Sequence, residues 1–150
     1  MTYWRNRLPW HLLLALRVFL GVVFAYAAWT KLRESWVLFA FQIDAYRLLP
    51  QWAVMAVARS LPWAELLLGM LLIAGKWLRL SASLVSLILI SFLAAMARSY
   101  LKGMQIDCGC FGSGDVISPY TLLRDSSLLA ASLVLTWLAF RAAPTNAKTR

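Results

Sequence analysis

The sequence predicts an all-α fold, a polytopic membrane bundle of four helices with both termini in the cytoplasm. The chain of 150 residues is 62% hydrophobic and only 14% charged, whereas a soluble domain is roughly 25% charged. Its apolar residues form four long runs, and its eight tryptophans stand near the ends of these runs, where amphipathic rings settle at the lipid boundary. From its length we expect one domain over residues 1–150.

Each apolar run is close to the roughly 20 residues that a helix needs to cross a bilayer core. The runs cover about residues 12–30, 52–75, 78–97 and 121–140. They do not alternate in polarity, and four strands cannot close a membrane barrel, so we exclude β-structure. The first run is long and contains Arg17. We therefore expect it to be a retained span and not a cleavable signal.

Pro62 interrupts the second run, because it lacks a backbone donor and clashes with the preceding turn. The fourteen residues from Pro62 to Gly75 reach only roughly 21 Å as a helix, which is short for a crossing. We expect one helix that starts after Pro50 and is kinked at Pro62. An interfacial helix over residues 51–60 is the alternative. Small residues in the third run permit close packing of the helices.

The charges set the orientation. Basic residues flank the apolar runs and form no patch with interleaved aromatics, so the net charge of +9 indicates membrane topology and not nucleic-acid binding. Each side of the membrane receives seven cations, and five of the six acids fall on the side opposite the termini. Several cations there stand at helix ends, so we assign the termini to the cytoplasm. The loop over residues 98–120 then faces the periplasm of a bacterium, and the chain lies in the inner membrane.

The two cysteines, Cys108 and Cys110, stand in the longest polar loop. Only a thiolate attacks a disulfide, so local charge decides their reactivity. Gly109 between them can take the backbone angles that a disulfide across one residue needs, and such strained bonds are labile and oxidising. Phe111 and Gly112 are expected to anchor and turn the loop. The cations near the loop are Arg98, Lys102 and Arg124, and the opposing acids are Asp107 and Asp115.

Three interpretations of the cysteine pair compete. A catalytic dithiol is favoured, because a structural disulfide across one residue removes almost no loop entropy and therefore stabilises little. A zinc site needs about four ligands, and His11, the only histidine, belongs to the opposite side. A Cu(I) site formed by the two thiolates and Met104 is the alternative as a binding protein, because soft ligands select Cu(I). We therefore predict no metal site for the favoured interpretation.

Ionisable residues inside membranes are functional candidates by default. Glu65 falls in the outer half of the second span, where Lys31, Arg98 or Arg124 could pair with it. One interpretation is a polar pocket beneath the cysteine loop that serves proton transfer or quinone binding. The other is an ion pair that only fixes the bundle. We expect Arg17 to extend to the cytoplasmic headgroups.

The start of the fourth helix carries Arg124 and Asp125. An acid near a helix N-terminus interacts favourably with the helix dipole. A capping role for Asp125 is therefore the preferred interpretation.

The chain resembles the MauE family, within the wider DoxX-like group of small four-helix membrane proteins. The resemblance covers nearly the whole chain, and the segment around the cysteines is its most specific part. It rests on Arg17, Gly21, Lys31, the run 46–50, Pro62, Glu65, Gly103, the run 107–112, Arg124 and Asp125.

The resemblance implies a role in maturing periplasmic redox enzymes. The family's named example supports biogenesis of the disulfide-rich small subunit of methylamine dehydrogenase, together with a thioredoxin-like protein. The expected partners are therefore the lipid bilayer and a periplasmic thioredoxin-like protein or client subunit. No cofactor is established by the sequence. Analogy with other four-helix disulfide-generating membrane enzymes indicates a quinone as electron acceptor. A bundle that only scaffolds a partner is the third hypothesis.

Overall fold

The computed structural model describes residues 3–111 and 114–141, with side chains from Trp10 onward, so Gly112 lies outside the described residues. The described chain is almost entirely helical, and four of its helices are long and apolar enough to cross a membrane. This confirms the predicted all-α polytopic bundle. The helices are α1 (Tyr3–Arg33), α2 (Trp36–Ala45), α3 (Gln51–Ala74), α4 (Leu78–Leu101) and α5 (Pro119–Arg141).

Helix α3 is continuous across Pro62, whose side chain is buried. The helix begins directly after Pro50 and ends directly before Gly75, which adopts a left-handed backbone with φ 70°. The prediction of one helix that starts after Pro50 is therefore confirmed, and residues 51–60 do not form a separate interfacial helix. The kink at Pro62 stays a prediction.

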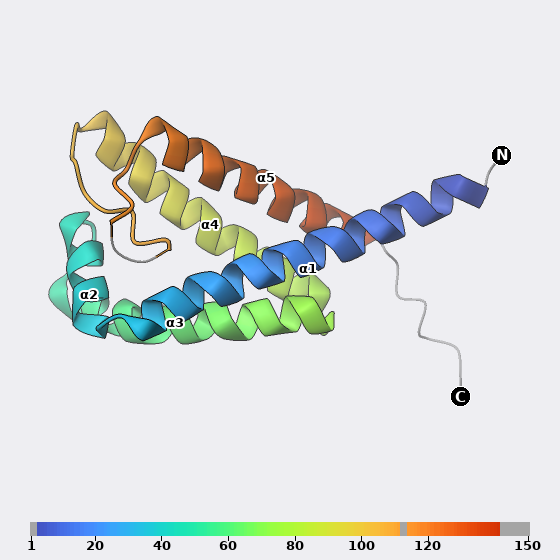
Figure 1. Ribbon diagram of the computed structural model, residues 1–150, viewed down its shortest axis with the longest axis horizontal. Coiled ribbons are helices and arrows are strands. Elements are labelled where there is room, and N and C mark those ends of the chain that lie inside the picture. The colour runs from blue at the N-terminus through green and yellow to red at the C-terminus, as the bar shows by residue number, and fades with distance from the viewer. Residues whose placement is uncertain (1–2, 112–113, 142–150) are drawn as a thin grey trace.

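The short helix α2 was not predicted, because residues 36–45 fall between the first two apolar runs. Ser35 precedes it with an extended backbone, and its hydroxyl accepts a hydrogen bond from the Val37 N–H at 3.3 Å. Such a cap satisfies one of the free donors at a helix start. Phe39 and Ala40 of α2 pack with Val54 of α3 in a small apolar cluster. This contact holds α2 across one end of the bundle (Figure 1).

Two glycines bring α1 and α3 into close contact. A Cβ atom on Gly21 would lie 2.9 Å from the Gly69 carbonyl oxygen, and one on Gly69 would lie 2.8 Å from the Gly21 oxygen. Small residues permit this kind of close helix approach in membranes. The two helices therefore pack closely where these glycines meet.

Hydroxyl groups join α4 to α5. The Ser86 hydroxyl donates to the Ser132 oxygen at 3.0 Å and lies 3.1 Å from that of Thr136. Ser86, one of the small residues of the third run, thus contacts a neighbouring helix, as predicted. This contact joins the two helices that the cysteine loop connects, in the halves that lie away from the loop.

The cysteine loop and α2 lie at one end of the bundle (Figure 1). The first turns of α1 and the last turn of α5 lie toward the other end. Arg17 also points to that second end, where its guanidinium lies so close to Gly75 that a Cβ on this glycine would collide with Nη1. The guanidinium therefore sits at the C-terminus of α3, where the helix dipole favours a cation.

Candidate functional site: a cysteine pair between a cation and a carboxylate

The cysteine loop is held by a short antiparallel contact between its two arms. The Cys108 N–H donates to the Asp115 carbonyl at 2.7 Å, and the Ile117 N–H donates to the Ile106 carbonyl at 3.0 Å. Asp107 and Val116 pair between these two hydrogen bonds. The loop around Cys108 is thus a small folded unit.

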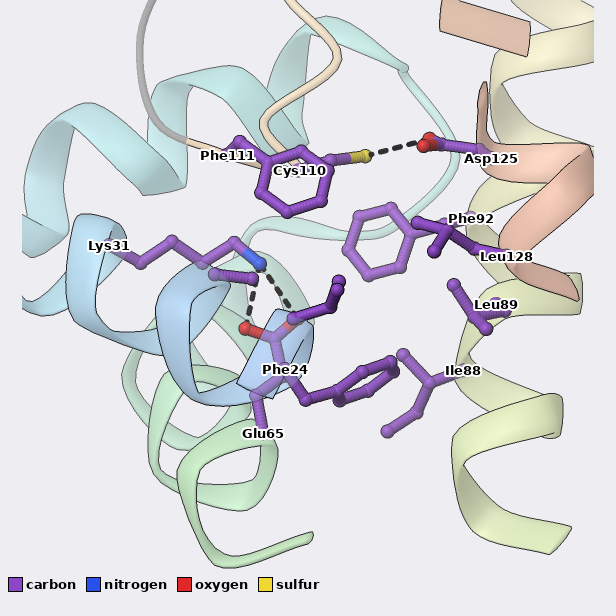
Figure 2. A pocket seen from close by; sticks show the side chains of 12 residues that line it. Phe24, Lys31, Glu65, Ile88, Leu89, Phe92, Cys110, Phe111, Asp125 and Leu128 are labelled. Atoms are coloured by element: carbon purple, nitrogen blue, oxygen red, sulfur yellow. Dashed lines mark hydrogen bonds and ion pairs between the residues drawn. The ribbon is translucent and has the colours of Figure 1, made fainter. Parts of the chain in front are cut away.

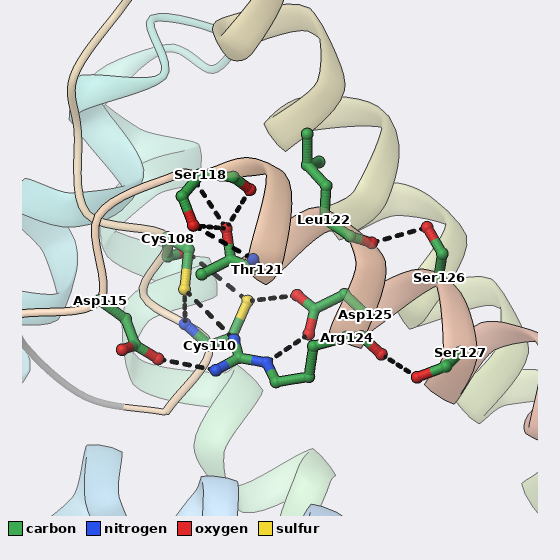
Figure 3. Close-up of polar contacts among 10 residues, drawn as sticks. All are labelled: Cys108, Cys110, Asp115, Ser118, Thr121, Leu122, Arg124, Asp125, Ser126 and Ser127. Carbon is green, nitrogen blue, oxygen red and sulfur yellow. Dashed lines mark hydrogen bonds and ion pairs between the residues drawn. The ribbon is translucent and has the colours of Figure 1, made fainter.

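The two sulfurs have opposite surroundings (Figure 3). The Cys108 sulfur accepts a hydrogen bond from the Cys110 N–H at 3.4 Å and lies 3.9 Å from the Arg124 Nη2 donor. The Cys110 thiol instead donates to the Asp125 carboxylate at 3.4 Å. The arrangement therefore favours negative charge on Cys108 and a proton on Cys110.

The pKa values of the pair follow this arrangement. The neighbouring Cys110 side chain is the largest influence on Cys108 and, with the Cys110 N–H and the Arg124 charge, lowers the Cys108 pKa to about 7. Burial and Asp125 oppose this shift. The interaction with Cys108, burial and the Asp125 charge raise the Cys110 pKa well above its usual range. The Cys108 thiolate is therefore the charged sulfur near neutral pH.

Arg124 connects the loop to α5. Its guanidinium donates to Asp115 at 2.8 Å and to Asp125 at 3.1 Å. The guanidinium also lies 4.5 Å from the centre of the Phe111 ring, a distance at which a cation is attracted to the ring face. These contacts hold Arg124 beside Cys108.

The predicted capping role of Asp125 is wrong. Helix α5 begins at Pro119, so Asp125 lies near the end of its second turn. Ser118 and Thr121 satisfy the helix start instead, because the Thr121 N–H donates to the Ser118 hydroxyl at 3.2 Å and the Ser118 N–H donates to that of Thr121 at 2.8 Å. Asp125 is buried and faces Cys110.

Helix α2 and its C-cap supply two residues of the site that were not predicted from the sequence. The Tyr46 hydroxyl donates to the Cys108 carbonyl at 2.9 Å, and burial raises the Tyr46 pKa, so it stays a donor. The buried Gln42 side chain lies over Gly109, where a Cβ would be 3.1 Å from Gln42 Oε1. Gly109 also has a φ of 69°, a backbone angle that residues other than glycine disfavour. A glutamine that follows a run of apolar residues in α2 was the available signal.

Lys31 and Glu65 form a buried ion pair beneath the loop. The Lys31 Nζ lies 2.7 Å from both carboxylate oxygens, and the rings of Phe39 and Phe92 lie 5.4 and 5.6 Å from it. Of the three predicted partners of Glu65, Lys31 is therefore the one present. Arg98 is exposed, and within residues 3–111 and 114–141 it makes no side-chain hydrogen bond or ion pair.

A cavity of about 40 Å³ lies between the ion pair and the cysteine loop (Figure 2). Lys31 and Glu65 line one side of it and Cys110 and Asp125 the other, with apolar walls between them. A buried water needs about 10–15 Å³ of such space. The cavity therefore has room for a few waters between the ion pair on one side and the Asp125 carboxylate and the Cys110 thiol on the other. Its apolar walls are formed by Val23, Phe24, Ala27, Ile88, Leu89, Phe92, Phe111 and Leu128.

The immediate neighbours of the two sulfurs are ionic side chains and not a larger group of metal ligands. Within the part of the chain that the structure describes, no three His, Cys, Asp or Glu side chains form a group that could hold a metal ion. The two sulfurs face a guanidinium and a carboxylate instead. This arrangement can stabilise a thiolate and hold a proton on its neighbour.

Comparison with known proteins adds the family. The family model described as methylamine utilisation protein MauE matches residues 9–138. The methylamine utilization protein MauE of Paracoccus denitrificans is 36% identical over 124 residues, which is 81% of this chain and 66% of that protein. The protein of the same name from Methylorubrum extorquens is 33% identical over 125 residues, with 81% and 67% covered. That of Paracoccus versutus is 38% identical over 122 residues, with 79% and 65% covered.

The chain thus spans about two thirds of the length of these curated relatives. No solved structure matches it significantly. The matched region contains all four membrane helices in large part and the whole cysteine loop. The chain therefore belongs to the MauE family.

Proposed function

We propose that this protein is a thiol–disulfide redox protein of the bacterial inner membrane that uses Cys108 and Cys110 to support the maturation of periplasmic redox enzymes. The observation that carries the proposal is the pair of opposite environments around the two sulfurs. One is placed beside the cation Arg124 and the other beside the carboxylate of Asp125. A dithiol that is polarised in this way suits exchange with another protein.

The loop geometry supports a labile pair over a structural one. The cysteines are separated only by Gly109, so a disulfide between them would remove very little chain entropy from the unfolded state. The loop is already held by backbone hydrogen bonds and by Arg124. A bond that adds so little stability and lies in a polarised site is expected to be broken and formed in function.

The family supplies the biological setting of the proposal. The relatives are named for methylamine utilisation, and we assign this chain an accessory role of the same kind. With the termini in the cytoplasm, the loop faces the periplasm, where disulfides persist. The expected exchange partner is a periplasmic thioredoxin-like protein or a client enzyme subunit, and a quinone is the candidate electron acceptor.

Thiol trapping in intact membranes tests the proposal. Free thiols are labelled with a large maleimide before and after reduction, in the wild type and in Cys108→Ser and Cys110→Ser variants. The proposal expects an intramolecular disulfide in the wild type that reductant opens and that neither variant forms. A Ser126→Ala variant is the matched control, because Ser126 is exposed on α5 and its hydroxyl donates to the Leu122 carbonyl of the same helix.

Two results would contradict the proposal. Both thiols could stay reduced under oxidising conditions, with labelling blocked only by Cu(I). This outcome would identify the alternative, a non-enzymatic Cu(I)-binding or assembly factor. Alternatively, the double variant Cys108→Ala and Cys110→Ala could support methylamine-dependent growth as well as the wild type, which would leave a scaffold function.

A further inference from the structure

The two cysteines differ in exposure as well as in charge, and this difference assigns them separate tasks. We propose that Cys110 is the sulfur that forms the mixed disulfide with a client thiol, and that Cys108 is the sulfur that departs as a thiolate. This inference rests on the proposed redox function and deepens it. It also gives the exchange a direction, in which the protein oxidises its client.

Accessibility is the first argument. Cys108 has 0% of its surface exposed and packs with Tyr46, Met96 and Ile117. Cys110 is partly exposed. A client thiolate must reach a sulfur atom from outside, along the line of the disulfide bond. Of the two residues, Cys110 is the one with surface open to such an approach, whereas Cys108 has none.

Electrostatics gives a second and independent argument. A disulfide between the two sulfurs can be opened in two ways, which leave the negative charge on different atoms. Charge on Cys108 is met by the Cys110 N–H and by the Arg124 guanidinium. Charge on Cys110 would face the buried Asp125 carboxylate, and two like charges at this separation repel strongly. Attack at Cys110 is therefore the favoured opening.

The exchange step balances without a further reactant. A client thiolate attacks the Cys110 sulfur, a bond forms between these two atoms, and the bond from Cys110 to Cys108 breaks. The electron pair of the broken bond stays on Cys108 as a thiolate. A second client thiolate then attacks the client sulfur of the mixed disulfide and releases Cys110, which takes up a proton and returns to its hydrogen bond with Asp125. The client loses two electrons and the cysteine pair gains them.

The direction follows from the stabilised leaving group. A thiol of low pKa leaves faster, and stabilisation of the reduced form makes a disulfide a stronger oxidant. The site therefore suits donation of a disulfide to a client and opposes reduction of one.

Mass mapping of a trapped mixed disulfide tests the assignment. The full chain in detergent is oxidised, mixed briefly with glutathione as the monothiol probe, quenched in acid and labelled with N-ethylmaleimide before digestion. We expect glutathione on Cys110 and maleimide on Cys108, at least tenfold over the reverse pattern. Equal or reversed labelling would overturn the assignment and leave the redox function standing. Failure to form the starting disulfide would overturn both.

Matched variants separate the two arguments. In Asp125→Asn the penalty on a Cys110 thiolate is removed, so the preference should fall several-fold while Cys110 stays the main site. In Arg124→Gln opening should be about tenfold slower, and Arg124→Lys, which keeps the charge, should recover part of the rate. Arg59→Gln is the control, because Arg59 also stacks on a ring, at 4.4 Å from the centre of that of Trp36, but lies outside the site. An unchanged labelling ratio in both Asp125→Asn and Arg124→Gln would refute the electrostatic argument.

Discussion

The polar groups beneath the loop and the polar groups within it differ in how completely they satisfy one another. Lys31 and Glu65 form a closed pair, because one ammonium contacts both carboxylate oxygens at 2.7 Å. Around the cysteines the contacts run from Arg124 and Asp125 to sulfur atoms at 3.4–3.9 Å. In the first arrangement, removal of either member leaves a buried charge without a partner. The second can change its bonding and its charge while its frame stays in place.

This comparison separates a structural element from a chemical one. Glycine contacts and the Lys31–Glu65 pair lock α1 to α3, whereas the loop between α4 and α5 holds its cysteines through backbone hydrogen bonds. The oxidation state of the sulfurs can therefore change without disturbing the helix bundle. The predictions below test this separation.

The largest expected effect is on exchange itself. Cys108→Ser and Cys110→Ser should each lower the rate of thiol oxidation by the purified protein by at least a hundredfold, because either change removes the disulfide. Both variants should reach the membrane at wild-type levels, since serine replaces only the sulfur atom and leaves the contacts between the helices in place. Glutathione oxidation and immunoblotting of membranes measure the two quantities. Appreciable turnover by either single variant would contradict the prediction.

The next effect is on stability. Glu65→Gln leaves Lys31 buried without a countercharge and should lower the free energy of unfolding by about 3–5 kcal/mol, measured by thermal unfolding in detergent. The double variant Glu65→Gln with Lys31→Met should recover most of this loss, because no unpaired charge remains. Cys108 ionisation should change little in the double variant. A single variant as stable as the wild type would show that the pair does not hold α1 to α3.

The ionisation of Cys108 should show a smaller but well-defined effect. Thiolate absorbance near 240 nm, taken as a difference from Cys108→Ser, should rise with pH around a midpoint of about 7, below the usual 9.0. Because the pKa is lowered in the fold, the thiolate is present above this midpoint and is lost as the pH falls through it. Cys110→Ala should move the midpoint upward more than Arg124→Gln, since the Cys110 side chain is the larger cause. An unshifted midpoint in Cys110→Ala would contradict this order.

The smallest effect compares two glycines of the same backbone conformation. Gly109 and Gly103 have φ values of 69° and 67°, so an alanine at either position costs roughly 1–2 kcal/mol of backbone strain. A Cβ on Gly109 also meets Gln42 at 3.1 Å, whereas nothing lies within 4 Å of one on Gly103. Gly109→Ala should therefore lower the melting temperature more than Gly103→Ala does. Equal losses in melting temperature would mean that Gln42 moves aside at no cost and does not pack tightly against the loop.

The bundle could be predicted from the sequence because four apolar runs of membrane length leave few alternatives. The pairing of Glu65 with Lys31 could not be singled out in the same way and was one of three candidates. Sequence places charges at a membrane depth but does not fix their rotation about the helix axis. Arg98 was considered for the same depth, and the structure turns it to an exposed position.

The remaining parts of the site depend on tertiary packing. Asp125 was assigned to the helix start because the apolar run begins near residue 121, but the helix itself begins at Pro119. Gln42 and Tyr46 reach the loop only because α2 folds back across the end of the bundle. No local sequence pattern predicts which loop a short helix will cover.

A redox titration of the Cys108–Cys110 pair tests the central claim most directly. The full chain is equilibrated in glutathione buffers of graded potential, quenched in acid, and its oxidised fraction is read from the mass added by a maleimide. We predict one two-electron transition at a potential more positive than that of thioredoxin, which is about −270 mV. A potential below about −300 mV, typical of structural disulfides, or no disulfide at any potential, would contradict the account.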